Sequence, residues 1–146
     1  MKKQEHKIII DASPEKVWNT IIGKETYPMW TALFAEGSMV ETDWKEGSKA
    51  VFGDGKGSGM LAIIETNVPN QFLSIRHIGE VVNGVEDTES ERVKSWAGAH
   101  ENYTLTKVEG KTEWLVEIDV NPEWEEYFAE AWPKAMDKVK EIAEQK

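Results

Sequence analysis

The sequence predicts an α+β fold in which a curved antiparallel sheet of about seven strands wraps around one long C-terminal helix. Two observations lead to this prediction. Strand-like segments follow one another through short turns, which makes the sheet antiparallel. The only amphipathic segment long enough to cover the apolar face of such a sheet is residues 122–142. The 146 residues suit a single domain, residues 1–146, with one core.

The N-terminal part is predicted to form one strand and two short helices. Residues 2–10 end in a β-branched run, which is typical of a strand. Ser13 and Pro14 suit the N-cap and the first position of a helix, which Gly23 ends. A second short helix is expected within residues 24–34, interrupted near its proline.

The middle of the chain is predicted to form hairpins. The glycine-rich stretch 53–59 is interpreted as a hairpin turn, because it lies between strands in an acidic chain and lacks the phosphate-loop pattern. The stretch 80–94 has five carboxylates and no hydrophobic period, and we interpret it as an exposed, mobile connection. The predicted strands are residues 37–44, 48–52, 60–66, 71–79, 97–108 and 112–120.

The C-terminal helix has aromatic residues in its first half and aliphatic residues in its second. Asn121 and Pro122 are predicted to begin it. Pro133 removes a hydrogen bond from its interior, so we expect a kink that leans the aromatic half over the mouth of a cavity. Its predicted apolar stripe is Trp124, Phe128, Ala131, Trp132, Ala135, Val139 and Ile142.

Composition disfavours several classes of function. Acidic residues outnumber basic ones by 27 to 17, and the net charge of −10 repels phosphate backbones and anionic lipid headgroups. No nucleic-acid partner and no membrane insertion are therefore expected. Cysteine is absent and the three histidines lack metal-ligand spacing, so no metal and no cofactor are predicted. The N-terminus has no apolar run suited to a signal peptide, which favours a cytoplasmic protein.

Several segments together resemble the SRPBCC superfamily of START-like, birch-pollen-allergen-like domains. They are IIIDASPEKVWNTI at residues 8–21, Trp30, Gly47-Ser48, residues 57–75, Thr112 and the tryptophan-rich last helix. The nearest branch is the one named after the C-terminal domain of the activator of the heat-shock-protein-90 ATPase. The resemblance implies a helix-grip fold, with a seven-stranded sheet around the C-terminal helix and a cavity between them. It implies no catalytic residue, because the superfamily includes lipid carriers, cyclases and co-chaperones.

Strand alternation selects candidate site residues on the concave face of the sheet. His77 shares a face with Leu73 and Ile75, while Ser74 and Arg76 face outward. The same reasoning groups Glu101 and Tyr103 with the inward side of the next strand. The candidate ligand-binding residues are Trp30, His77, Glu101, Tyr103, Trp114, Phe128 and Trp132. Two alternatives stay open: the polar residues could reach water without a specific role, and the aromatic residues could be ordinary core.

The function predicted from the sequence is binding, without catalysis, of a small hydrophobic or amphipathic molecule between the sheet and the C-terminal helix. One alternative is a co-chaperone-like interaction domain whose acidic face meets a basic protein partner. Another is an enzyme of the cyclase or aromatase type. A binding protein requires an open cavity, an interaction domain a filled interior with an exposed apolar patch, and an enzyme a polar pair within hydrogen-bonding reach inside the cavity.

Overall fold

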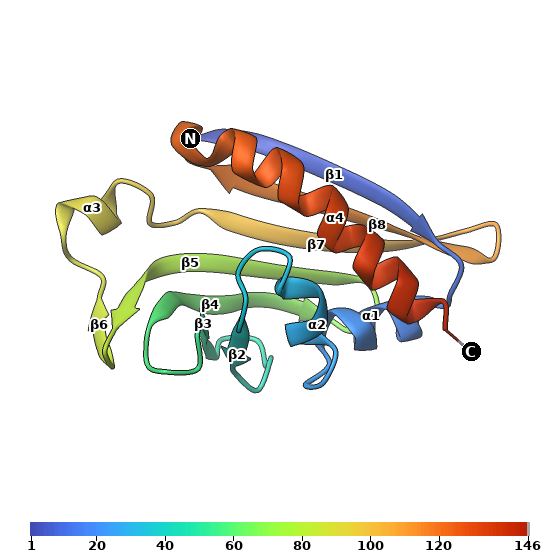
Figure 1. The fold of residues 1–146 in the computed structure, drawn as a ribbon, viewed down its shortest axis with the longest axis horizontal. Coiled ribbons are helices and arrows are strands. Elements are labelled where there is room, and N and C mark those ends of the chain that lie inside the picture. Colours follow the sequence, from blue (N-terminus) through green and yellow to red (C-terminus); the bar gives the residue numbers. More distant parts are fainter. Residues whose placement is uncertain (146) are drawn as a thin grey trace.

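An eight-stranded antiparallel sheet forms the body of the protein (Figure 1). The computed structural model describes residues 1–145. The strand order is β1-β8-β7-β5-β4-β3-β2, and the short β6 pairs with β5 beside this path. The strands are β1 (Lys2–Ile10), β2 (Met39–Glu41), β3 (Lys49–Gly53), β4 (Gly59–Val68), β5 (Phe72–Val82), β6 (Val85–Asp87), β7 (His100–Val108) and β8 (Lys111–Val120).

Two short helices follow β1, as predicted. The helix α1 (Pro14–Ile22) begins after Ser13, whose hydroxyl accepts a hydrogen bond from the Lys16 amide at 3.2 Å. The second helix, α2 (Tyr27–Thr31), is shorter than the predicted range 24–34. Its proline, Pro28, lies in the first turn, where the missing amide breaks no helical hydrogen bond.

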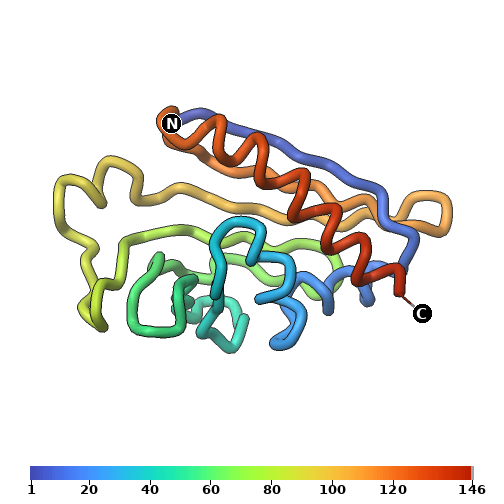
Figure 2. The backbone as a smooth tube through the Cα atoms, in the orientation of Figure 1, coloured from blue at the N-terminus to red at the C-terminus, as the bar shows by residue number. Residues whose placement is uncertain are grey.

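The long helix α4 (Glu125–Ala143) lies across the concave face of the sheet (Figure 1). Figure 2 shows it running along the N-terminal strand β1, with which it is in contact. The face toward the sheet buries Ala131, Trp132, Ala135, Met136, Val139 and Ala143. The predicted α+β helix-grip architecture is therefore confirmed. The sheet has eight strands where about seven were expected.

The start of this helix differs from the predicted stripe. Residues Pro122–Trp124 form a turn of 3-10 helix, which Asn121 caps by accepting a hydrogen bond from the Glu123 amide at 3.2 Å. A 3-10 turn has three residues per turn, so the spacing of an α-helical stripe does not extend through it. Trp124 is consequently 50% exposed and does not belong to the buried face. Pro133 lies on the exposed side of α4, which continues through it as one helix.

The acidic stretch 80–94, predicted to be an exposed, mobile connection, is largely exposed but contains the end of β5, the strand β6 and a short helix. The strand β5 extends into it, and a tight turn at Asn83 and Gly84 leads back into β6. Both turn residues have positive φ, 51° and 80°, as a two-residue hairpin requires. The short helix α3 (Glu91–Lys94) follows, capped by Ser90 and anchored by the fully buried Val93. The strand that the sequence did not predict is therefore β6.

Val93→Ala should lower the free energy of unfolding by about 1–3 kcal/mol, because it empties a fully buried site. Val85→Ala is the matched control: Val85 lies in the same stretch but is exposed, so its loss should change stability by less than about 0.5 kcal/mol. Urea unfolding followed by circular dichroism measures both. Equally small effects of the two substitutions would contradict an ordered α3.

Candidate functional site

The space between α4 and the sheet is filled by aromatic rings. Trp30 of α2, Trp114 of β8 and Trp132 of α4 are 1%, 0% and 3% exposed. The centroids of their rings lie 5.8 Å (Trp30–Trp114), 6.0 Å (Trp30–Trp132) and 6.2 Å (Trp114–Trp132) apart. Such separations are typical of packed aromatic pairs. The open cavity expected from the sequence is thus occupied by the side chains that were predicted to line it.

The hollows of the surface lie elsewhere. Among the described residues, a hollow of about 220 Å³ lies on the outer face of the sheet, between polar side chains of β1, β4, β5, β7 and β8. A second, of about 150 Å³, lies between the glycine-rich loop at 53–59 and the β5–β6 hairpin. Neither is bordered by α4, so neither is the predicted site.

Three buried polar atoms of the concave side have no hydrogen-bond partner. In the described part of the chain, four buried side-chain polar atoms are unpaired, and three of them are Trp114 Nε1, Trp132 Nε1 and His77 Nδ1. A buried donor without an acceptor costs about 1–3 kcal/mol. Because most buried polar groups in native proteins are paired, a cluster of unpaired ones requires an explanation.

A polar group lies beside the aromatic rings and involves three of the predicted residues. His77 Nε2 lies 3.1 Å from Glu101 Oε1, and the Tyr103 hydroxyl donates a hydrogen bond to the other oxygen of the same carboxylate. The contact across β5 and β7 follows from the strand register, which places Ile75 opposite Glu101. The side chains of His77 and Glu101 are 16% and 23% exposed, so the group lies between the interior and solvent.

A bulge in the β4–β5 ladder lies directly beside His77. Ala62 is paired with His77 and Leu61 with Gly79, so that Ile78 is an extra residue. A bulge bends its strand and changes the direction of neighbouring side chains. Alternation alone selects the inward face for His77, but it contains no information about this bend.

Burial and the Glu101 carboxylate raise the pKa of two tyrosines. Burial is the larger cause for Tyr103, and the charge and hydrogen bond of Glu101 add to it, so its pKa lies well above the usual value. Burial and then the charge of Glu101 also raise the pKa of Tyr27 in α2. Both phenols are therefore protonated at neutral pH, which makes the Tyr103 hydroxyl the donor and Glu101 the acceptor.

One short segment covers the aromatic interior on the side of α2. Within residues 32–37, Phe34 is the only side chain that is not exposed. The centroid of its ring lies 4.8 Å from that of Trp132 and 6.3 Å from that of Phe128, a half-buried residue at the rim. The Tyr127 hydroxyl donates a hydrogen bond to the Phe34 carbonyl. Figure 1 shows this segment after α2 rising toward α4.

A family model matches nearly the whole chain. It describes activator of Hsp90 ATPase homolog 1-like proteins and covers residues 11–144. The chain belongs to this family. The resemblance to the helix-grip superfamily, and to this branch of it, is thereby confirmed. No curated protein sequence matches the chain significantly.

Several solved structures are similar to this protein over nearly its whole length. The Aha1 dimer of Colwellia psychrerythraea is 19% identical, with a TM-score of 0.74, covering 99% of this chain and 97% of that one. ChR145 of Cytophaga hutchinsonii is 20% identical, with a TM-score of 0.71 and coverages of 99% and 94%. DynU16, a protein of the dynemicin biosynthetic locus, is 13% identical, with a TM-score of 0.71 and coverages of 99% and 48%. These similarities show a shared fold.

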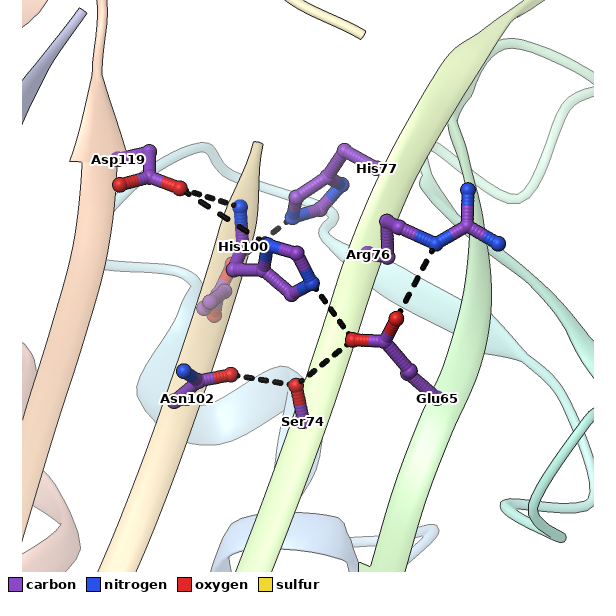
Figure 3. A network of polar contacts seen from close by, with 8 residues as sticks. Glu65, Ser74, Arg76, His77, His100, Asn102 and Asp119 are labelled. Carbon is purple, nitrogen blue, oxygen red and sulfur yellow. Dashed lines mark hydrogen bonds and ion pairs between the residues drawn. The ribbon is translucent and has the colours of Figure 1, made fainter. Parts of the chain in front are cut away.

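Sequence reasoning missed a polar network on the outer face of the sheet (Figure 3). His100 Nε2 lies 2.6 Å from Glu65 Oε2, and the His100 amide donates to Asp119 at 2.9 Å. The Ser74 hydroxyl lies 2.6 Å from Asn102 Oδ1, so it is not directed at the imidazole as a catalytic nucleophile would be. Alternation predicted the outward direction of Ser74, but only the strand order and register bring these side chains together.

Within residues 1–145 the structure has neither a metal-binding group of side chains nor a membrane-spanning helix. No group of three His, Asp or Glu side chains is arranged to hold a metal ion. None of the helices in this part of the chain is both long and apolar enough to cross a membrane.

The unpaired indoles lead to a prediction about stability. Trp30 Nε1 donates a hydrogen bond to the Ile21 carbonyl at 3.1 Å, whereas Trp114 and Trp132 have no acceptor. Trp30→Phe should therefore destabilise the protein by about 1 kcal/mol more than Trp114→Phe or Trp132→Phe, because it leaves a buried carbonyl without its donor. Urea unfolding measures the three variants. An equal loss in all three would show that the indoles of Trp114 and Trp132 are hydrogen-bonded in solution.

Proposed function

We propose that the protein binds a small, mostly apolar molecule between α4 and the sheet, without reacting with it. The observation that carries this proposal is the cover over the aromatic interior. The half-buried Phe34 packs against the ring of Trp132 on that side, with the two ring centroids 4.8 Å apart. The rest of the covering segment, residues 32–37, is exposed and contributes no other side chain to the interior.

Displacing Phe34 is energetically accessible. Exposing a fully buried phenylalanine costs about 1.5–3 kcal/mol, which is an upper bound for the half-buried Phe34. Breaking the hydrogen bond from the Tyr127 hydroxyl to the Phe34 carbonyl adds at most about 1 kcal/mol, because water partly replaces it at this exposed position. An opening cost of at most about 4 kcal/mol makes the open state a minor one and weakens binding by at most roughly a thousandfold relative to a preformed pocket. A ligand with an aromatic ring recovers the lost contacts with Trp132.

The comparisons are compatible with both a small-molecule role and an interaction role. DynU16 shares the fold and is described as a protein of the dynemicin biosynthetic locus. The Aha1 dimer shares it as well, so the fold by itself favours neither class of function. The filled interior on its own suits an interaction domain better than a binding protein. The unpaired polar atoms of Trp114, Trp132 and His77 favour a ligand, because a protein partner on the surface would leave them unpaired.

Phe34→Ala should raise the affinity for the neutral dye Nile red by roughly tenfold or more, because it removes the cost of opening. The matched control is Leu33→Ala, which removes an exposed neighbouring side chain and should leave the affinity unchanged. Fluorescence titration of the three proteins measures the effect. The proposal fails if Phe34→Ala binds the dye no more tightly than the Leu33→Ala control.

A second candidate is proton transfer on the bound molecule, and the contact of His77 with Glu101 favours it. A carboxylate only accepts hydrogen bonds, so His77 Nε2, 3.1 Å from Glu101 Oε1, is the nitrogen that donates. This tautomer leaves a lone pair on the buried Nδ1, which has no hydrogen-bond partner within the described residues. An imidazole oriented by a carboxylate is a common general base.

The substrate analogue 5-nitrobenzisoxazole tests this candidate, because removal of its ring C–H proton breaks the N–O bond and releases a coloured phenolate. The second candidate predicts a reaction rate above that of free imidazole at equal concentration, lost in His77→Ala. His100→Ala is the control, since His100 lies on the outer face of the sheet. A rate that survives in His77→Ala would exclude His77 as the base.

A further inference from the structure

We infer that the ligand is a neutral aromatic molecule with a hydrogen-bond acceptor, such as a ketone or quinone oxygen, received by the indole N–H groups of Trp114 and Trp132. The inference rests on the proposed function, because it specifies which molecule the same interior accepts. It specifies the chemical class of the ligand, which the apolar lining of the interior does not define by itself.

The two indoles offer donors and nothing else. The indole nitrogen of tryptophan donates a hydrogen bond and cannot accept one. Trp114 and Trp132 are 0% and 3% exposed, and their Nε1 atoms have no partner within the described residues. Trp30 in the same cluster does have one, the Ile21 carbonyl. Packing in this cluster therefore does not by itself prevent an indole from finding an acceptor.

The surrounding side chains do not supply the missing acceptor. The ring of Tyr103 lies 5.6 Å from that of Trp114 and 6.0 Å from that of Trp132, between the two indoles and the polar group. Its hydroxyl is directed at Glu101. A water molecule is a weaker match than a carbonyl, because its own two hydrogens would also need acceptors. A carbonyl oxygen has acceptor sites only, and it matches the two indole N–H donors.

Charge selects a neutral ligand. The Glu101 carboxylate lies at the edge of this interior, and the chain has a net charge of −10. A carboxylate ligand would lose its hydration and be repelled by Glu101. An ammonium ligand has no acceptor to offer to an indole N–H. A neutral carbonyl ligand is not repelled by Glu101, and it offers an acceptor to the indole N–H groups.

The shape of the interior selects a planar ring. Phe34 contacts Trp132 with ring centroids 4.8 Å apart and the planes inclined by 68°. Trp114 stands at 88° to Trp30 and at 77° to Trp132. An aromatic ligand that takes the position of the Phe34 ring keeps this edge-to-face geometry against Trp132.

Three probes with one skeleton test the inference: 2-acetylnaphthalene, 2-ethylnaphthalene and 2-naphthoate. The first two differ by a carbonyl in place of a methylene group, and the third adds a negative charge. Equilibrium dialysis against the whole protein measures their affinities. We expect 2-acetylnaphthalene to bind roughly tenfold more tightly than 2-ethylnaphthalene, because only its oxygen pairs the buried donors, and 2-naphthoate to bind most weakly.

Substitution by phenylalanine removes one donor and keeps a ring. The preference for 2-acetylnaphthalene over 2-ethylnaphthalene should fall several-fold in Trp114→Phe and in Trp132→Phe. It should persist in Trp124→Phe, the control, whose side chain is half exposed on the other side of the helix start. Circular dichroism establishes whether each variant folds. If Trp114→Phe does not fold, Trp132→Phe alone tests the inference.

The outcomes separate the inference from the function on which it rests. Equal affinity for the acetyl and ethyl probes in the wild-type protein overturns the ligand class and leaves binding intact. So does a preference that survives in the phenylalanine variants. If none of the three probes binds to the wild-type protein or to Phe34→Ala, the proposed function and the inference both fall.

Discussion

Trp132 is the main contact between the long helix and the rest of the molecule, and the other features of the concave side depend on it. Its ring packs against rings from α2, β1, β7, β8 and the segment after α2, namely Trp30, His6, Tyr103, Trp114 and Phe34. Each such pair adds about 0.5–1.5 kcal/mol beyond the apolar area that it buries. The helix is held firmly enough that the indole N–H can be buried without an acceptor, at a cost of about 1–3 kcal/mol.

That compromise explains why a filled interior can still be a binding site. The aromatic rings close the fold in the absence of a ligand, while the unpaired donors of Trp114 and Trp132 leave polar interactions that a suitable guest can complete. The polar group around Glu101 limits what such a guest can be, because its charge lies beside the same rings. In the proposed function, Phe34 is a replaceable part of the core, because it belongs to an exposed segment and packs on Trp132 where a planar ligand would bind.

The sequence predicted those parts of the fold that depend on local pattern. The alternation of β8 and the Ser13 cap were sufficient for their elements. The stretch 80–94 was misjudged because its charges report exposed side chains and not the pairing of the backbone in β6. Alternation also brought His77, Glu101 and Tyr103 to one face, but it could not show whether five large rings leave any space. Phe34 was missed because it lies within the apolar run 32–35, and the sequence does not distinguish it from its exposed neighbour Leu33.

The most direct test of the unpaired indole donors is the proton resonance of each tryptophan indole, assigned by single substitutions. Indole N–H groups without an acceptor resonate upfield of hydrogen-bonded ones. In the free protein, Trp114 and Trp132 should therefore lie upfield of Trp30, whose Nε1 donates to Ile21 at 3.1 Å. On addition of 2-acetylnaphthalene, the signals of Trp114 and Trp132 should move downfield while that of Trp30 stays in place. Downfield positions for all three in the free protein, or no movement on addition of the ketone, would contradict the account.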